Sequence, residues 1–315
     1  MLKKDELTIY LTSKCQLSCK HCYRPDGEKE LMPDDLFWIL DKIKNKRTTF
    51  LGGEPLLYPH IKDCIEAFPK TIISTNSLLV ENNIDKIKGV EGIQLSVEGG
   101  RQETEFLRGK DVWETAISAA QLLEKEGIQF YLRTSFWLGN LGFLEEFNTL
   151  GYPLVLMPRL DKPPLPEGAT KGLFEEVLRH DNWILALPNF MQYLGKRGRC
   201  KAGSERLNVL YDGKITPCNF DLDYTIGRIG DDINRVERNI DIYLDVHKQI
   251  PTECLGCKNV EVCRGSCYMV KAYAGCPLRY NFSISDFMGR YKIGDKEMKE
   301  HTARLTGFMR RMLVC

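Results

Sequence analysis

The sequence predicts an α/β fold, a partial (β/α)6 barrel with a cysteine-rich C-terminal extension. Between residues 7 and 181, short β-rich segments alternate with amphipathic helical segments. Such repetition is typical of parallel strands joined by right-handed helical crossovers. Six repeats indicate a partial barrel rather than the eight repeats of a closed one. After about residue 185 the helical periodicity gives way to segments rich in glycine and cysteine, so the repeat is expected to end there.

The expected strands are rich in Val, Ile, Thr and aromatic residues and are bounded by Gly, Pro or Asn. They are residues 7–12, 48–53, 71–76, 92–99, 129–137 and 153–160. A helix is expected over 33–44, because Pro33 suits the first helical position and two aspartates follow it in the first turn. A second helix is expected over 112–127, with Gly127 at its C-cap. Both helices connect expected strands.

The part of the chain after the repeat is expected to fold differently. Residues 206–218 predict a β-hairpin that turns at Asp212 and Gly213, where glycine tolerates a positive φ. We predict a barrel domain over residues 1–185, a cysteine-rich domain over 186–290, and a C-terminal helix over 291–315 that packs on the barrel.

Charge and hydropathy exclude several classes of protein. The 315 residues include 44 basic and 43 acidic side chains, so the net charge of +1 gives no reason to expect nucleic acid or a membrane surface as a partner. No apolar run approaches the ~20 residues that span a bilayer. The charged start of the chain has no apolar signal-peptide segment, so a cytoplasmic location is expected. In a reducing compartment, the 12 cysteines are expected to bind metal rather than form disulfides.

Three cysteines follow the first expected strand with the spacing C-x3-C-x2-C, namely Cys15, Cys19 and Cys22. A structural zinc site prefers four ligands. A cubane iron–sulfur cluster needs one thiolate per iron, so three thiolates leave one iron open to another ligand. Open coordination positions are typical of catalytic sites, and loops at the carboxyl ends of barrel strands carry active sites. The spacing therefore favours a catalytic cluster over structural zinc.

The same stretch resembles the C-x3-C-x-Φ-C signature of the radical S-adenosylmethionine (SAM) enzymes, with His21 at the Φ position and Tyr23 just after the motif. The resemblance implies that SAM binds the open iron through its amino and carboxylate groups. One electron then cleaves SAM to methionine and a 5′-deoxyadenosyl radical, which abstracts hydrogen from a substrate. The resemblance also places His21 and Tyr23 at the cofactor, with His21 packed near the adenine.

Further matches to this family follow in order, each at the end of an expected strand. The GGEP stretch resembles the motif that holds the SAM amino group, and its glycine pair allows the backbone to approach a ligand closely. The STN stretch resembles the polar end of the third strand, near the ribose. QLSVEG resembles the fourth-strand motif, with Glu98 where the family usually has Asp. Two arginines are alternative partners of the SAM carboxylate, because guanidinium binds carboxylate in a bidentate way. The implied cofactor-binding residues of these motifs are Gly52, Gly53, Glu54, Ser74, Asn76, Ser96 and the alternatives Arg108 and Arg133.

Seven later cysteines, in the pattern C-x17-C, then C-x2-C-x5-C-x3-C-x8-C, resemble the SPASM extension of some radical SAM enzymes. By themselves the four closely spaced cysteines could also form a zinc knuckle. The resemblance implies two auxiliary clusters, and so three [4Fe–4S] clusters in all. The distal auxiliary cluster is held by Cys254, Cys257, Cys263 and Cys276, and the nearer one by Cys200, Cys218 and Cys267.

The nearer auxiliary cluster is thus one cysteine short. Its remaining iron is open, bound by a residue other than cysteine, or bound by Cys315. Cys64 lies on an expected helix and is best explained as a small buried apolar residue.

SPASM enzymes mostly modify peptides, so the leading hypothesis is oxidative crosslinking of a peptide through a C–C or thioether bond. A reducing partner such as ferredoxin or flavodoxin is expected. Because the first strand begins near residue 7, a leader peptide is expected to bind without an N-terminal recognition domain. Asn219 stands where the sulfatase-maturing members carry an aspartate base, which disfavours formylglycine formation. The base is unassigned, with Asp221 and Asp223 as candidates.

Two alternatives are open at this point. One is small-molecule chemistry, such as oxidation or decarboxylation of a porphyrin or an aminosugar. The other is a structural or electron-carrying protein that binds iron–sulfur clusters or zinc without catalysis. The sequence identifies neither the substrate nor the hydrogen that is abstracted, and it does not indicate the oligomeric state.

Overall fold

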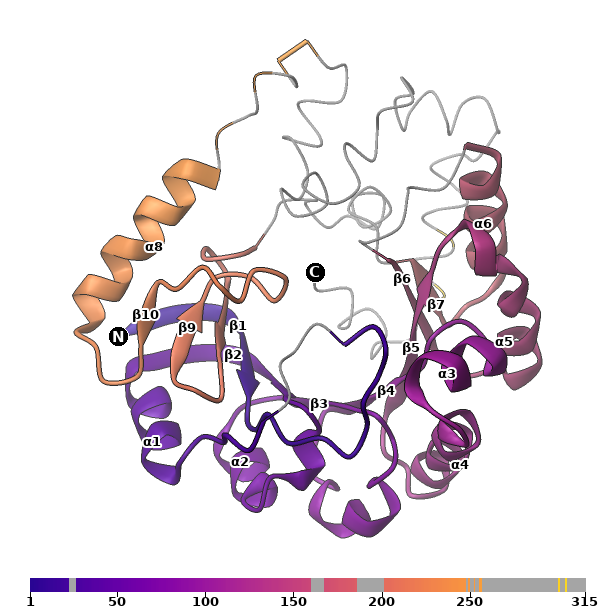
Figure 1. Cartoon of the computed structure of the whole chain (residues 1–315), viewed down its shortest axis with the longest axis horizontal. Helices are drawn as coiled ribbons and strands as arrows, with labels where there is room; N and C mark the ends of the chain where they lie inside the picture. Colours follow the sequence, from indigo (N-terminus) through magenta and orange to yellow (C-terminus); the bar gives the residue numbers. More distant parts are fainter. Residues whose placement is uncertain are drawn as a thin grey trace. The chain divides into compact units, whose positions relative to one another are not determined.

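The computed structural model describes residues 1–22, 27–159, 167–185 and 201–247, with the single residues 249, 252, 255, 256, 300 and 304. Its contacts group the chain into two compact units (Figure 1). Unit 1 consists of Met1–Val97, Arg101–Tyr131 and Lys201–His247. Unit 2 contains Glu98–Gly100 and, among the described residues, 132–159 and 167–185.

Unit 1 is built on a sheet whose strand order is β10-β9-β8-β1-β2-β3-β4. Neighbouring strands from β8 to β4 run parallel, and β9 and β10 run antiparallel. The strand bounds are β1 Leu2–Tyr10, β2 Ile43–Leu51, β3 Thr71–Thr75, β4 Gly92–Ser96, β8 Arg206–Val209, β9 Lys214–Thr216 and β10 Gly227–Arg228. The predicted α/β fold with parallel strands is thereby confirmed.

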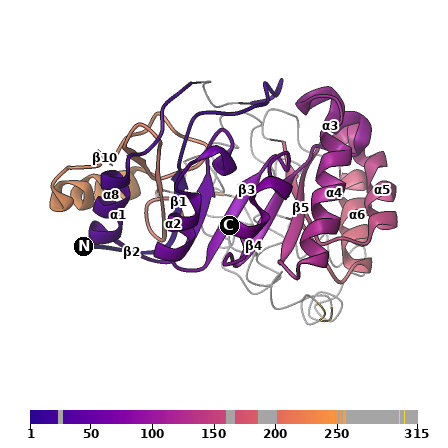
Figure 2. The ribbon, with the colours of Figure 1, turned by 90° about the horizontal axis from the view of Figure 1, so that it is seen from below.

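The helices of unit 1 follow its strands in alternation. They are α1 Pro33–Lys42, η1 Pro55–Leu57, α2 Ile61–Ala67, η2 Glu81–Lys86, α3 Arg101–Arg108, α4 Val112–Lys125 and α8 Ile233–His247. Figures 1 and 2 show α1 and α2 on the same face of the sheet. Alternate strand residues on that face are apolar and fully buried, among them Ile9, Phe50 and Ile73. Phe50 meets Phe68 edge to face at 5.7 Å between ring centroids.

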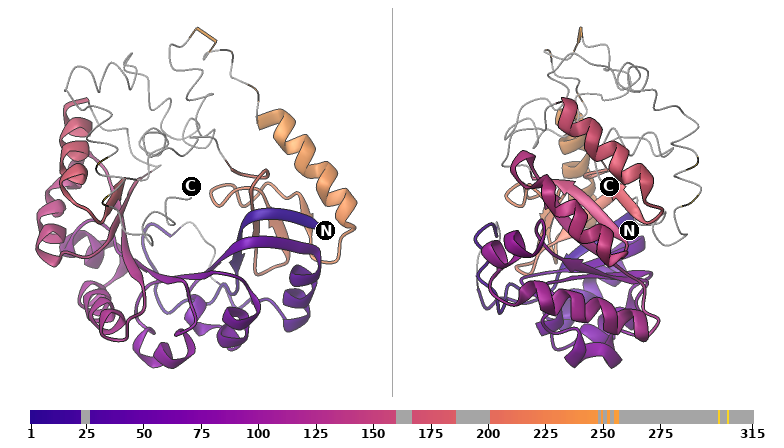
Figure 3. Two further views of the ribbon diagram at one scale, coloured as in Figure 1. Left: turned by 180° about the vertical axis from the view of Figure 1, so that it is seen from behind. Right: turned by 90° about the vertical axis from the view of Figure 1, so that its right-hand side faces the viewer.

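Unit 2 continues the same pattern. Strand β5, Phe130–Phe136, begins in unit 1 and continues into unit 2, where it pairs in parallel with β6, Leu154–Pro158. Strand β6 in turn pairs in parallel with β7, Trp183–Leu185. The helices η3 Leu138–Phe143, α5 Leu144–Leu150 and α6 Glu167–Arg179 connect them. Figure 3 shows the helices α5 and α6, in magenta to pink, on one side of the strands of unit 2.

All six predicted strands exist, but two of them begin five residues earlier than predicted. Strand β1 begins at Leu2 rather than residue 7, and β2 begins at Ile43, directly after α1. Both early segments are rich in lysine, which hides their strand character. They pair with each other in register from Leu2 opposite Ile43, so the ladder overrides the low local strand propensity. Strand β7 was not predicted; it is only three residues long.

The predicted hairpin is confirmed as β8 and β9, with its turn at Asp212 and Gly213, where φ of Gly213 is 79°. Its place in the fold was not foreseen. Strand β8 pairs in parallel with β1, so the hairpin extends the sheet of unit 1, as Figure 1 shows in orange beside indigo. The predicted boundaries at residues 185 and 290 stay a prediction, because 186–200 and nearly all of 248–315 lie outside the described residues.

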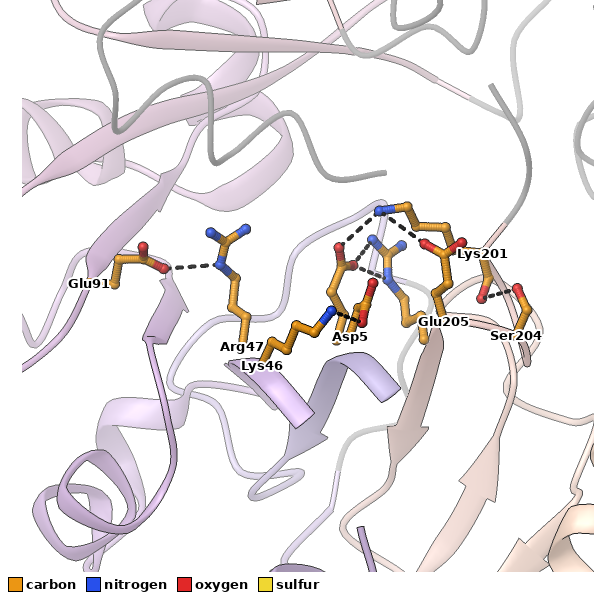
Figure 4. A network of polar contacts seen from close by, with 9 residues as sticks. Asp5, Lys46, Arg47, Glu91, Lys201, Ser204 and Glu205 are labelled. Atoms are coloured by element: carbon orange, nitrogen blue, oxygen red, sulfur yellow. Dashed lines mark hydrogen bonds and ion pairs between the residues drawn. The ribbon is translucent and has the colours of Figure 1, made fainter. Parts of the chain in front are cut away.

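A network of charged side chains fastens this hairpin to β1 (Figure 4). The carboxylate of Glu6 accepts hydrogen bonds from Arg206, whose Nε lies 2.8 Å away, and from Lys201 at 3.3 Å. The Glu6 side chain is only 12% exposed. On the same strand, Lys4 Nζ donates to the carbonyls of Gly203 and Ser204 at 2.6 and 3.0 Å. These bonds link β1 to a segment about 200 residues later in the chain.

No helix among the described residues is long and apolar enough to cross a membrane.

The Glu6→Gln substitution tests this network. It removes the negative charge that pairs with half-buried Arg206 and one of the two carboxylates beside Lys201, so we expect a loss of about 2 kcal/mol in the free energy of unfolding. The measurement is equilibrium denaturation in urea. Asp5→Asn is the matched control, because Asp5 and Lys46 are 45% and 78% exposed and solvent screens their ion pair, so this substitution should change the free energy of unfolding much less. Equal effects of the two substitutions would contradict the assigned role of Glu6.

Candidate active site

The three N-terminal cysteines lie in a loop that leaves the end of β1 and returns to it. We call residues 12–31 the cysteine loop; the structure describes 12–22 and 27–31 of it. Its two ends are joined by backbone bonds, Ser13 N to Lys29 O at 2.8 Å and Leu31 N to Leu11 O at 2.9 Å. The Ser13 hydroxyl also accepts from Lys29 N at 2.9 Å. The loop is therefore closed at its base, and the three cysteines lie within the closed loop.

The glycine pair that follows β2 packs directly against the first residues of this loop. Gly53 N donates to Thr12 O, and Glu54 N donates to Lys14 O, both at 2.7 Å. A Cβ atom would lie 2.6 Å from Thr12 O if added to Gly52, and 2.2 Å from Lys14 O if added to Gly53. The sequence predicted that the glycine pair lets the backbone approach a ligand closely. The neighbour seen here is the backbone of the cysteine loop; the ligand contact stays a prediction.

Glu54 is fully buried and joins the ends of β2 and β3. Its Oε1 accepts from Leu56 N at 3.0 Å and from Thr75 Oγ1 at 2.8 Å, and its Oε2 accepts from Asn76 N at 2.8 Å. Burial raises the pKa of Glu54 from 4.5 to about 7, although these donors and the positive charge of Arg108 act in the opposite direction. The sequence pointed to Glu54 and Asn76, but the partnership with Thr75 depends on packing between strands.

Cys15 is the cysteine with the most defined surroundings. Its Sγ lies 3.4 Å from Leu17 N and 3.7 Å from Asn76 Nδ2, and both groups donate to it. Burial raises the pKa of the Cys15 thiol, and the nearby charges of Glu54 and Cys22 raise it further. Donors aimed at a sulfur favour its thiolate form, which is the form that binds metal.

The other two cysteines occupy the next turn of the loop. Cys22 N donates to Cys19 O at 3.0 Å, and the Cys22 side chain is exposed. Among the described residues, no group of three His, Cys, Asp or Glu side chains gathers closely enough to hold a metal ion. A cubane binds one thiolate at each of several corners, so its cysteines need not meet at one point. Three thiols on one closed loop, with NH donors at Cys15, fit such a cluster.

The middle of the cysteine loop is held by α3. Lys20 N donates to Leu107 O at 2.8 Å, and Lys20 Nζ lies 3.6 Å from the centre of the Phe106 ring. Arg108 ends the same helix, and its charge acts on Glu54. The structure therefore brings Arg108 to the cysteine-loop side of unit 1. The alternative, Arg133, belongs to unit 2, where its Nε donates to Met157 Sδ at 2.9 Å.

Two serines at strand ends were also predicted to bind the cofactor. The hydroxyl of Ser74 accepts from Gln94, which in turn accepts from the hydroxyl of Tyr131 at 3.0 Å. Ser74 and Gln94 are directly paired in the parallel ladder, which places both on one face. Ser96 is buried at the end of β4. Sequence spacing suggested the serines but gave no signal for Gln94, because its partners come from other strands.

The remaining predicted residues are only partly described. His21 is half-buried in the cysteine loop, and Tyr23 lies outside the described residues. Of the predicted auxiliary-cluster cysteines, only Cys218 is described; it is buried, and Phe220 N donates to its Sγ at 3.4 Å. The cysteines outside the described residues are Cys200, Cys254, Cys257, Cys263, Cys267, Cys276 and Cys315. Cys64 is buried on α2, as expected for an apolar residue.

The two candidate bases follow Cys218 closely. Asp221 Oδ1 accepts from Tyr224 N at 3.3 Å, and Asp223 is exposed. Burial lowers the pKa of His247, and the charge of Asp221 acts in the opposite direction. The ring of His247 lies 4.3 Å from that of Tyr243. Asp221 therefore has a defined turn-forming contact, whereas a role as a base stays a prediction.

The Gly53→Ala substitution tests the contact between the glycine pair and the cysteine loop. Because the added Cβ would collide with backbone, we expect a loss of about 2 kcal/mol in the free energy of unfolding and a lower iron content after anaerobic reconstitution. Thermal unfolding and iron analysis measure the two effects. Gly172→Ala on α6 is the control, since its Cβ would meet open space and alanine favours a helix. An unchanged melting temperature and iron content in the Gly53 variant would contradict this assignment.

The Glu54→Gln substitution tests the raised pKa. The pKa of Glu54 is about 7 in the folded chain, against 4.5 for a carboxyl group in water. Protonation therefore stabilises the fold fully below pH 4.5, and this contribution is lost as the pH rises to about 7. Glutamine does not titrate. We therefore expect the unfolding free energy of the wild type, relative to the variant, to fall by about 3 kcal/mol over this range. Urea denaturation at several pH values measures the difference, and a difference independent of pH would contradict the assignment.

Comparison with known proteins finds similarity to one family over the segment that contains this site. Residues 9–146 match the family model described as the Radical SAM superfamily. The GTP 3′,8-cyclase of Chlorobaculum tepidum is 29% identical over 108 residues, or 30% of this chain, which spans only 33% of the cyclase. The mycofactocin maturase MftC of Mycobacterium tuberculosis is 23% identical over 320 residues, covering 86% of this chain and 80% of the maturase.

Solved structures with a similar fold are also found. Histidine-tagged anSMEcpe with bound AdoMet matches with a TM-score of 0.73 at 17% identity, covering 99% of this chain and 98% of that chain. Native anSMEcpe with bound AdoMet and Cp18Cys peptide matches with a TM-score of 0.68 at 17% identity, covering 98% and 99%. At such low identity the likeness shows the fold alone. The family match shows that residues 9–146, the segment that contains the closed cysteine loop, are similar to the Radical SAM superfamily.

Proposed function

We propose that the protein is a radical SAM enzyme that modifies a peptide by oxidative crosslinking. The observation that carries the proposal is the closed loop with three thiols, packed by its backbone against the GGE segment at the neighbouring strand end. When bound there, an iron–sulfur cluster with SAM supplies a carbon radical that takes a hydrogen atom from the substrate. All other roles fall to residues of the chain.

Cys15, Cys19 and Cys22 are the proposed cluster ligands. The two NH donors at Cys15 Sγ favour its thiolate, and the backbone bonds at the loop base keep the loop in place. Glu54 uses both carboxylate oxygens on donors of the chain, so it fixes the ends of β2 and β3. Arg108 supplies a guanidinium for the SAM carboxylate on the same side of unit 1.

The proposed peptide substrate rests on relatives that share most of the chain. A maturase resembles it over 86% of its length, and anSMEcpe, of the same fold, has been solved with a peptide bound. Asn219 cannot accept a proton at neutral pH, which argues against formylglycine formation. The two auxiliary clusters and an external one-electron donor belong to the same proposal. The similarity to the GTP 3′,8-cyclase covers only 30% of the chain.

The first test asks whether the chain cleaves SAM. Anaerobically reconstituted protein with SAM and dithionite is expected to release 5′-deoxyadenosine and to contain about twelve irons if three cubanes are present. Cys19→Ala should abolish the release and lower the iron by about four. Cys64→Ala is the cysteine control, because Cys64 is buried on α2 and is not among the proposed cluster ligands, and this variant should keep both the release and the iron. A wild type that releases no 5′-deoxyadenosine would identify a structural or electron-carrying protein instead.

The second test concerns the substrate. The reconstituted enzyme is incubated with small peptides encoded next to its gene, and mass spectrometry is expected to show a loss of two hydrogens per crosslink. Tandem fragmentation should then fail between the two joined residues. SAM cleavage that leaves every such peptide unchanged in mass would contradict the peptide proposal and favour a small-molecule substrate.

A further inference from the structure

The side chain of Asn76 is held in one orientation at the end of β3. Its Oδ1 accepts from Leu78 N at 3.1 Å, and its own backbone N donates to Glu54 Oε2 at 2.8 Å. Since Oδ1 faces a donor, the amide NH2 must point the other way. Asn76 is only 6% exposed, so water does not compete freely for that NH2 group.

The NH2 group of Asn76 points at Cys15. Its Nδ2 lies 3.7 Å from Cys15 Sγ, a bond between residues 61 positions apart in the chain. Leu17 N donates to the same sulfur from within the loop, at 3.4 Å. Cys15 therefore receives one donor that its own loop supplies and one that the neighbouring strand supplies. The second exists only because Glu54 and Leu78 N hold Asn76 in place.

We infer that Asn76 is a positioning residue that makes the cluster held by Cys15 easier to reduce. The inference rests on the proposed function, because it requires a cluster at the cysteine loop. Hydrogen bonds to the sulfurs are among the factors that set the reduction potential of iron–sulfur clusters. A donor stabilises the extra negative charge that one electron brings, so the reduced form gains more from Asn76 than the oxidised form. This role is separate from any contact of Asn76 with SAM.

Asn76→Ser tests the inference by removing the NH2 group. The serine hydroxyl can still accept from Leu78 N in a local turn, so the strand end keeps its shape. At a fixed ambient potential, the ratio of reduced to oxidised cluster is expected to fall about tenfold, equivalent to about 59 mV for a one-electron couple. The measurement is a dithionite titration followed by EPR, read on the signal that Cys19→Ala removes. No SAM is added, so a lost SAM contact cannot produce the shift.

Asn83→Ser is the matched control. Asn83, on η2, is also a buried asparagine, but its Nδ2 donates to the carbonyl of Leu79 and not to a cysteine. The reduction potential of the cluster in Asn83→Ser should equal that in the wild type. The inference would be overturned if the cluster of Asn76→Ser had the same reduction potential as that of the wild type. It would also be overturned if the two variants shifted this potential equally.

A second measurement uses the wild-type chain, so it does not depend on a variant that folds. Side-chain 15N labelling of asparagine should give a weak nitrogen coupling to the reduced cluster in pulsed EPR. The absence of that coupling would overturn the inference. If the wild type releases 5′-deoxyadenosine while the coupling or the shift is absent, only the role of Asn76 fails. If no cluster forms at all, the proposed function itself fails.

Discussion

The buried carboxylate of Glu54 is the constraint on which the candidate site depends. A carboxylate removed from water must be matched by donors, and Glu54 finds three, from η1, from Thr75 and from the backbone of Asn76. Since the donors come from two successive strand ends, satisfying one residue sets the relative positions of both. The same strand end then directs the Asn76 amide at Cys15. One buried charge thus connects the GGE segment, the third strand and the cysteine loop.

The second constraint is the close packing of two backbones. Gly52 and Gly53 leave no room for a side chain, because the carbonyls of Thr12 and Lys14 lie where their Cβ atoms would be. These glycines let the loop after β1 rest on the loop after β2. Together with the bonds that close the cysteine loop at its base, this gives the thiols a rigid support at the carboxyl end of parallel strands, where active sites of such folds are found.

Much of the site could be predicted because its chemistry lies in short, continuous motifs. The spacing of Cys15, Cys19 and Cys22 and the GGEP stretch can be recognised without any knowledge of distant contacts. The partners that orient these residues could not be predicted. These contacts depend on which strands and helices become neighbours. They include the hydrogen bonds of Thr75 and Gln94 and the contact of Lys20 with Phe106. A hydrogen bond between residues 61 positions apart leaves no trace in local sequence.

The sequence by itself determined the α/β class, the order of the strands along the chain and the identity of the cysteine loop, because periodicity and motif spacing are local properties. Only the tertiary structure decided that β1 begins at Leu2, where pairing with β2 outweighs a lysine-rich segment of low strand propensity. Only it placed the late hairpin beside β1, through the charges of Glu6, Lys201 and Arg206. Such contacts form between parts of the chain that are distant in sequence, and they exist only once the sheet has formed.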